Sequence, residues 1–245
     1  MEPYYQTENV TLYHGDCLDI LPELQADIVI ADPPYGIDYQ SARRIDRTQW
    51  KPKIQNDTAP FVSWIPDSFN VLTEGGRLIC FYRWDVQDEF YNALDEAGFT
   101  IKSQIIWDKV VHGMGDLAGE FAPQHENMIY ATRGRYTFTS ARPKSVIRCQ
   151  RVNAESLLHP NEKPAGLIEE LILSLTERND LVLDPFIGSG TTAIAAIRIG
   201  RRCIGIDISS EYLDVAIQRI ERELQQPRLF VVQSKPQAEQ VKLWQ

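Results

Sequence analysis

The chain has 245 residues, 43% of them hydrophobic, which is enough for one large core, so we expect a single catalytic domain over residues 1–245. It lacks a run of about 18 apolar residues, and its N-terminus resembles no signal peptide, so the sequence predicts a cytoplasmic protein without membrane contact. A formal net charge of -9 argues against a uniformly basic, nucleic-acid-binding surface.

Apolar periodicity alternates between strands and helices along the chain. Strands are predicted at 27–31, 77–82, 99–109, 127–134, 181–186 and 203–208. Helices are predicted at 61–72, 86–98, 166–177, 191–200 and 211–224. This alternation predicts an α/β fold with a mostly parallel sheet that helices cover on both faces.

The first predicted strand ends at Asp32-Pro33-Pro34-Tyr35. Two prolines cannot continue a sheet ladder, and each holds the preceding residue extended, so this exit is expected to be rigid. An acid and an aromatic ring at a rigid strand end suit a functional site. The alternative is a strand-terminating turn with a capping aspartate.

Basic residues are concentrated in two segments despite the negative net charge. Residues 40–53 carry five basic side chains against Asp46 alone, and residues 127–154 carry six and no acid. These segments are either solvated loops or surfaces for the phosphates of a nucleic acid. The four cysteines are scattered without metal-ligand spacing, so we predict free thiols and no metal site.

A glycine turn follows the strand predicted at 181–186. Gly188-x-Gly190-x-x-Ala193 precedes a helix, and Asp207 ends the next strand, about twenty residues after the first glycine, which matches a nucleotide-binding fingerprint. The alternative is that the glycines only form a tight turn and that Asp207 makes a hydrogen bond within a loop. Asp184 ahead of the turn would repel a dinucleotide's phosphates but attract a cation, which favours S-adenosylmethionine, a cofactor with an ammonium, a sulfonium and a ribose.

Together these motifs resemble the β class of bacterial and phage DNA amino-methyltransferases, which use S-adenosylmethionine. The family's catalytic "DPPY" stands at residues 32–35, its cofactor motif "DPFxGSGTT" at 184–192, and its H-P-x-x-K-P element at 159–164. The resemblance covers roughly residues 12–224. It implies a Rossmann-like class I methyltransferase fold with a seven-stranded sheet and circularly permuted motif order.

The resemblance also implies roles for individual residues. The predicted cofactor-binding residues are Asp16, Lys163, Asp184, Phe186, Gly188, Ser189, Gly190, Thr191 and Asp207. The predicted DNA-contacting insertions are the loop 36–60 and a short target-recognition segment at about 134–156. The candidate DNA-binding residues in and beside them are Arg43, Arg44, Arg47, Lys51, Arg133, Arg135, Arg142 and Lys144.

The catalytic motif predicts a mechanism for methylating an exocyclic amine. Asp32 and the carbonyl of Pro33 would each accept one N–H, which localises the amine's lone pair, and Pro34 would keep this acid and carbonyl rigid. The base must first be flipped out of the duplex, and Tyr35 is placed to stack on it. The function that the resemblance implies is site-specific methylation of adenine N6 in double-stranded DNA.

Three alternatives are left open by the sequence. Cytosine-N4 methylation needs the same geometry, although Asp at position 32 favours adenine in the family. A nicotinamide-dependent oxidoreductase would explain the glycine turn but not residues 32–35, and a non-catalytic DNA-binding module would not explain the acids at both motifs. A homodimer and a cognate restriction endonuclease are expected partners by resemblance.

Overall fold

The computed structural model describes residues 1–36, 59–113, 118–119, 121–139, 141–152 and 163–226. Nine strands form one sheet in the order β1-β2-β9-β8-β3-β4-β6-β5-β7. The strands are β1 (Tyr5–Gln6), β2 (Val10–His14), β3 (Ala26–Ala31), β4 (Leu72–Tyr82), β5 (Thr100–Asp108), β6 (His125–Thr132), β7 (Val146–Arg148), β8 (Leu181–Asp184) and β9 (Arg202–Asp207).

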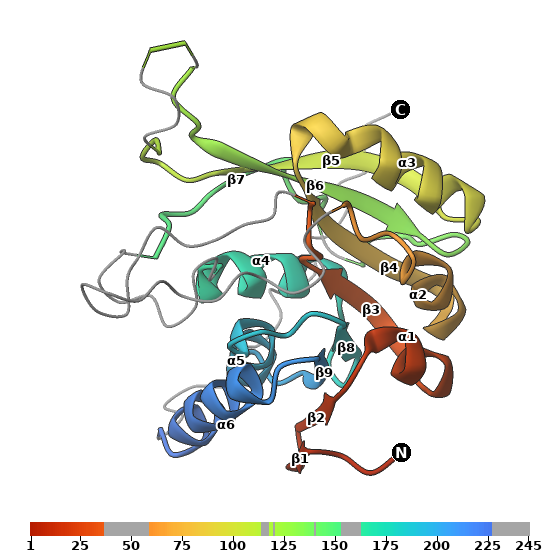
Figure 1. Ribbon diagram of the computed structural model, residues 1–245, viewed down its shortest axis with the longest axis vertical. Coiled ribbons are helices and arrows are strands. Elements are labelled where there is room, and N and C mark those ends of the chain that lie inside the picture. The colour runs from red at the N-terminus through yellow and green to blue at the C-terminus, as the bar shows by residue number, and fades with distance from the viewer. Residues whose placement is uncertain (37–58, 114–117, 120, 140, 153–162, 227–245) are drawn as a thin grey trace, which may run out of the picture.

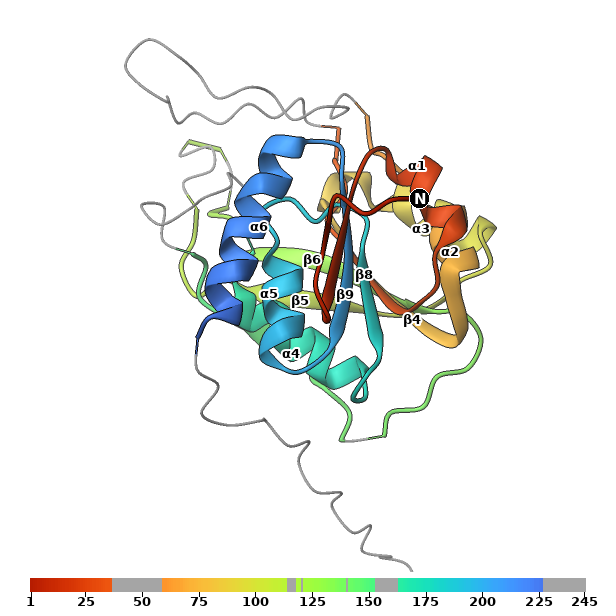
Figure 2. The same cartoon turned by 90° about the horizontal axis from the view of Figure 1, so that it is seen from below.

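Helices cover both faces of this sheet, as the alternating pattern predicts (Figures 1 and 2). The helices are α1 (Cys17–Ile20), α2 (Ile65–Val71), α3 (Gln87–Glu96), α4 (Ala165–Leu175), α5 (Thr191–Arg198) and α6 (Ser210–Leu224), with short 3-10 turns η1 (Leu21–Glu23) and η2 (Trp84–Val86). Helices α4, α5 and α6 share one hydrophobic cluster with the sheet, and α1, α2 and α3 share the other. The predicted α/β class I fold is confirmed.

The sheet is a core of seven strands with a short strand added at each edge. From β2 across to β4 every neighbouring pair is parallel, whereas β6 runs antiparallel to both β4 and β5. The edge strands β1 and β7 have only two and three residues. The predicted seven-stranded sheet therefore corresponds to the strands from β2 to β5 in this order.

Two predicted boundaries were wrong. The helix expected at 61–72 begins only at Ile65, because Pro66 lies in its first turn, where a proline is tolerated, and would break a helix that started earlier. Leu72 then begins β4, which passes through Gly75 and Gly76 and is longer than the strand predicted at 77–82.

The fold places the carboxyl ends of its parallel strands at one edge. The chain leaves β3 towards β4 on one side, and leaves β8 towards β9 on the other, so β3 and β8 flank a topological switch point. Ligands of open α/β sheets bind in the crevice outside such a point. Asp32, which follows β3, and Asp184, which ends β8, both lie at this edge.

Candidate active site

The exit from β3 is held by backbone contacts to residues 59–61. Tyr35 forms an isolated bridge with Pro60, and the amide of Phe61 donates to the carbonyl oxygen of Pro34 at 3.0 Å. Gly36 has a φ of 78°, and a Cβ at this position would lie 2.5 Å from the backbone of Ala59. The rigid exit predicted from the two prolines is thus reinforced by a second segment of chain.

Both oxygens of the Asp32 carboxylate have partners within the protein. The hydroxyl of Tyr35 donates to Oδ1, and the ammonium of Lys163 lies 2.7 Å from Oδ2. The ring of Tyr35 packs edge-on against Phe90, with centroids 6.5 Å apart. Asp32 is therefore held between an aromatic hydroxyl and a cation.

Lys163 continues this contact into a chain of alternating charges. Its ammonium also lies 3.2 Å from Oε2 of Glu126, and Oε1 of Glu126 lies 2.7 Å from the ammonium of Lys109. The side chain of Lys163 is only 11% exposed, and its nitrogen sits 4.9 Å from the centre of the Phe81 ring. The resemblance predicted a cofactor contact for Lys163, whereas the structure places it between two acids.

Burial and neighbouring charges shift the pKa values of Lys163 and Glu126 in opposite directions. Burial alone would lower the pKa of the Lys163 ammonium, but Asp32 and Glu126 raise that pKa above its ordinary value. Burial would raise the pKa of Glu126, but Lys163 and Lys109 hold it below the usual range. Burial, followed by the charge of Asp32, raises the pKa of Tyr35 well above 10. At neutral pH, Lys163 and Glu126 are therefore charged and the Tyr35 hydroxyl is protonated.

The glycine turn between β8 and α5 is organised by Asp184. One carboxylate oxygen accepts the amide of Phe186 at 2.9 Å, and the other accepts the hydroxyl of Thr192 at 2.6 Å. Burial raises the pKa of Asp184 to about 7, a shift that Thr192 and Phe186 oppose and the charge of Asp32 increases. Asp184 thus fixes the shape of the turn through hydrogen bonds inside the protein.

Asp207 ties the same turn to the end of β9. Its carboxylate accepts the amides of Gly188 and Ser209, both at 2.8 Å, and burial raises its pKa. Gly190, the N-cap residue of α5, has a φ of 84°, and a Cβ there would lie 2.8 Å from Cβ of Ala216. The glycine allows both the left-handed turn and the close approach of α6.

Ser189 and Thr191 form hydrogen bonds with a side chain of α6, a contact that the sequence did not predict. The guanidinium of Arg219 donates to the carbonyl and the hydroxyl of Ser189, both at 2.7 Å, and reaches the hydroxyl of Thr191 at 3.4 Å. Both side chains are buried. They therefore contribute to the shape of the turn through Arg219.

Phe186 connects the turn to the exit from β3. Its ring packs edge-on against Phe61 and Trp64, with centroid separations of 6.0 and 5.4 Å. Phe61 is also the residue whose amide bonds to Pro34. The two predicted motifs are thus in contact through one aromatic cluster, although more than 150 residues separate them.

Asp16 lies at the same edge, just beyond β2. Its carboxylate caps α1 by accepting the amide of Leu18 at 3.0 Å, and it is partly exposed. Its neighbour His14 pairs with Asp207 across β2 and β9. The structure therefore gathers Asp16, Asp184, Asp207 and Asp32 at the carboxyl edge of the sheet.

The candidate DNA-binding residues divide into three groups. Arg43, Arg44, Arg47 and Lys51 lie outside the described residues. Arg133 makes a structural contact that the sequence did not predict, because its guanidinium donates to the carbonyls of Phe69, Asn70 and Leu72 at the end of α2. Arg135, Arg142 and Lys144 are exposed and available for phosphates.

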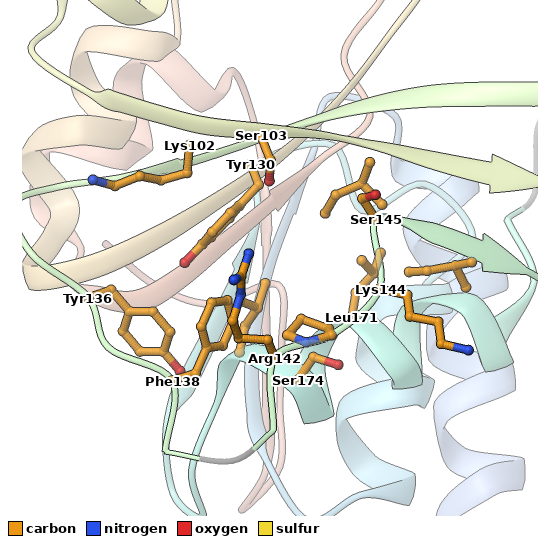
Figure 3. A pocket seen from close by; sticks show the side chains of 14 residues that line it. Lys102, Ser103, Tyr130, Tyr136, Phe138, Arg142, Lys144, Ser145, Leu171 and Ser174 are labelled. Carbon is orange, nitrogen blue, oxygen red and sulfur yellow. The ribbon is translucent and has the colours of Figure 1, made fainter. Parts of the chain in front are cut away.

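Arg142 and Lys144 line a cavity of about 370 Å³ together with Lys102 and the rings of Tyr130 and Tyr136 (Figure 3). The cavity lies between α4 and the part of β5 around Ser103, which pairs with Tyr130. Glu126 pairs with Trp107, farther along β5. Arg142 and Lys144 therefore lie beside a different part of β5 from the one that Glu126 contacts, and they are not part of the cluster around Asp32.

Glu126 and Lys109 were missed by the sequence analysis. Lys109 directly follows β5, and Glu126 is the second residue of β6, where it faces Trp107 in the antiparallel register. An acid before a predicted strand is a weak signal, because only this register brings it to the edge of the sheet where Asp32 lies. Within the described ranges, the structure contains no group of three or more potential metal-binding side chains and no helix suited to crossing a membrane.

Comparison with known proteins places this chain in a family. A family model described as DNA methylase, of the N6 and N4 type, matches residues 26–218. The chain is 29% identical to the Type II methyltransferase M2.DpnII of Streptococcus pneumoniae, over 91% of this chain and 93% of the relative. It is 30% identical to the putative methylase YubD of Escherichia coli K12, over 86% of this chain and 92% of the relative.

Solved structures share the fold. The M1.HpyAVI–SAM complex superposes with a TM-score of 0.68 at 24% identity, over 86% of this chain and 99% of that one. The cytosine-N4-specific PvuII DNA methyltransferase superposes with a TM-score of 0.71 at 19% identity, over 91% of this chain and 93% of that one. At these identities the likeness supports the fold.

Proposed function

Since the chain belongs to the N6 and N4 DNA methylase family, we propose that it transfers the methyl group of S-adenosylmethionine to N6 of an adenine flipped out of double-stranded DNA. Within this family we assign it to the β class, with the catalytic motif 32–35 ahead of the cofactor turn 184–192 in a permuted order. A DNA substrate also supports a cytoplasmic location.

The observation that carries this proposal is the meeting of the two motifs at the switch point between β3 and β8. Asp32 and Asp184 follow neighbouring parallel strands, and the charge of Asp32 adds to the effect of burial on the pKa of Asp184. Phe61 contacts both motifs. A methyl donor at the glycine turn would therefore lie beside an amine held at Asp32.

The proposed chemistry at the amine is a direct transfer. Asp32 and the carbonyl of Pro33 accept the two N–H groups, so that the lone pair of the nitrogen points to the methyl group. S-adenosylmethionine would supply an electrophilic methyl: the N–C bond forms as the S–C bond breaks, S-adenosylhomocysteine leaves, and the methylated amine releases one proton to solvent. Orientation of this kind contributes roughly 7–11 kcal/mol in well-aligned reactions.

The contacts of the Asp32 carboxylate add one requirement to this mechanism. The Tyr35 hydroxyl occupies Oδ1 of Asp32, and Lys163 occupies Oδ2. Each carboxylate oxygen can accept a second hydrogen bond, but we propose that the incoming amine displaces the hydroxyl of Tyr35, so that the ring can turn and stack on the base. Pro34 stays fixed during this exchange through its bond to Phe61.

The cofactor is proposed to lie along the carboxyl ends of β2, β9 and β8. Asp207 retains acceptor capacity for ribose hydroxyls beside its two amide bonds, and Asp16 is placed for the adenine. Gly188 allows close approach of the ligand, Gly190 contributes to the site through the turn that it forms against α6, and Phe186 offers an apolar ring. Asp184, Ser189 and Thr191 support the turn from within the protein.

Cytosine N4 is the second candidate for the target. One structural neighbour, the PvuII enzyme, is described as cytosine-N4-specific, and the same acid and carbonyl can bind either amine. Asp at position 32 is the feature that favours adenine. The family match argues against the nicotinamide-dependent oxidoreductase and the non-catalytic binding module.

The proposed partners follow from the substrate and the relatives. Duplex DNA would contact Arg135, Arg142 and Lys144 and, from outside the described residues, Arg43, Arg44, Arg47 and Lys51. Several relatives are named Type II methyltransferases, which supports a cognate restriction endonuclease as a partner. A homodimer would let two short recognition segments share one DNA site.

The test is to incubate genomic and plasmid DNA with the protein and methyl-labelled S-adenosylmethionine, digest the DNA, and identify the labelled nucleoside. The proposal predicts N6-methyladenine in a fixed sequence context. N4-methylcytosine would select the second candidate, and DNA without label would contradict both. A cofactor titration without DNA checks that the donor binds.

A further inference from the structure

The contacts around Lys163 suggest a role that differs from cofactor binding. The four groups Lys109, Glu126, Lys163 and Asp32 alternate in charge, with successive contacts of 2.7, 3.2 and 2.7 Å. Hydrogen bonds between charged groups at such distances are the strong ones in proteins. The last group in this row of alternating charges is Asp32, the acid that is proposed to receive the substrate amine.

We propose that Lys163 is a positioning residue that fixes the Asp32 carboxylate for the amine, and that Glu126 and Lys109 hold Lys163 in place. This inference rests on the proposed function, because it takes Asp32 as the group that binds the amine. The Asp χ2 torsion is broad and roughly two-fold, so an unrestrained carboxylate rotates easily. A cation on Oδ2 restricts that rotation and leaves Oδ1 to exchange between Tyr35 and the substrate.

Lys163 is itself well placed to act as a fixed support. It directly precedes Pro164, the N-cap residue of α4, and the buried face of α4 anchors this helix in the core. The lysine stem is long and rotatable, so its position depends on what its ammonium contacts. Two acids from separate segments and the face of Phe81 define that position.

Glu126 transmits the arrangement of the central strands to Lys163. It is the second residue of β6, beside Asn127, which pairs with Tyr82 of β4, and it faces Trp107 of β5. Lys109 neutralises the second oxygen of Glu126 and stacks on Trp107, with its nitrogen 5.3 Å from the ring centre. A glutamate held in this way attracts Lys163 without competing for the amine.

The experiment compares Lys163→Met, Lys163→Arg and Glu126→Gln with the wild-type chain. The single-turnover rate of methyl transfer is measured at saturating DNA and donor, and the Kd for S-adenosylmethionine is measured separately by calorimetry without DNA. Arg77→Met is the matched control: it also removes the cation of a buried ion pair, here 2.5 Å from Asp180, at a site remote from Asp32. Thermal unfolding is followed for every variant.

For Lys163→Met the inference predicts a rate loss of about 10²-fold, the size expected from misplacing a reacting group by about 1 Å, with the cofactor Kd within about twofold of wild type. Lys163→Arg should recover about tenfold of that loss, since it restores a cation, and Glu126→Gln should lose about tenfold in rate alone. Arg77→Met should lose thermal stability and keep the wild-type rate.

Two results would overturn the inference. One is a Lys163→Met rate within about threefold of wild type; the other is a cofactor Kd that rises in proportion to the rate loss, as a contact to the cofactor carboxylate would produce. If Lys163→Met does not fold, an unchanged rate in Glu126→Gln overturns it and a selective rate loss supports it. Absence of methylation by the wild-type chain contradicts the proposed function instead.

Discussion

The hydroxyl of Tyr35 donates a hydrogen bond to Oδ1 of Asp32, three residues earlier in the chain. The same residue is thereby a partner of Asp32 and the proposed stacking surface for a flipped base. In the proposed mechanism the substrate amine replaces the hydroxyl on Oδ1, so the ring and the hydroxyl of Tyr35 have separable roles.

This separation predicts different behaviour for two substitutions of Tyr35. Tyr35→Phe keeps the ring and frees Oδ1, so we expect a methylation rate within about threefold of wild type. Tyr35→Ala removes the stacking surface, which is worth about 1–3 kcal/mol per base, so we expect kcat/KM to fall by roughly 10- to 100-fold. Steady-state kinetics with a short duplex measures both. Equal impairment of the two variants would contradict separate roles.

Asp184 makes a pH-dependent contribution to stability. Burial raises its pKa to about 7 in the folded protein, whereas an aspartate in an unfolded chain titrates near 4. Between these values the folded state keeps a proton that the unfolded state has released. The contribution is therefore fully present below about pH 4 and is lost as pH rises through about 7.

Asp184→Asn should remove this dependence. Each unit of pKa shift corresponds to about 1.4 kcal/mol, so between pH 5 and 7.5 the free energy of unfolding of the wild type should fall by about 2–3 kcal/mol relative to the variant. Urea titrations of both proteins at the two pH values measure the difference, and all other titrating groups are common to both. Parallel pH profiles would show that Asp184 does not titrate in this window.

The basic residues of the recognition segment should separate by function. Arg142→Ala and Lys144→Ala are each expected to weaken DNA binding and to reduce the slope of log affinity against log salt by about 1 if they contact phosphate. Fluorescence anisotropy at several NaCl concentrations gives these slopes. An unchanged slope for both variants would exclude the phosphate contacts.

Arg133→Ala provides the contrasting case on the same segment. Its guanidinium holds three carbonyls at the end of α2, so its loss should cost about 1–3 kcal/mol in the free energy of unfolding. The salt slope of DNA binding should stay at the wild-type value. A reduced slope without loss of stability would restore the DNA contact that the sequence predicted for Arg133.

The sequence predicts the parts of the fold and site that depend on local patterns. The run at 27–31, the helix at 166–177 and the turn at 184–192 follow from periodicity, proline and glycine. A parallel sheet brings Asp32 and Asp184 to one edge, because the carboxyl ends of parallel strands meet there, but their closeness depends on β3 lying beside β8. These features needed no knowledge of strand register.

The features that the sequence missed depend on long-range register. Glu126 reaches Lys163 only because β6 runs antiparallel between β4 and β5 with Trp107 opposite Glu126. Arg133 appeared to be part of a basic surface, but the end of α2 lies within its reach. The strands β1 and β7 are too short to produce a pattern and form by addition to existing edges.

The most direct test of the account is the replacement Asp32→Asn, which keeps the shape of the side chain and removes its charge and one acceptor oxygen. We predict that single-turnover methyl transfer to DNA falls by at least about 10³-fold, while calorimetry shows a Kd for S-adenosylmethionine within about twofold of wild type. Methyl transfer within about tenfold of the wild-type rate would contradict Asp32 as the group that binds the amine.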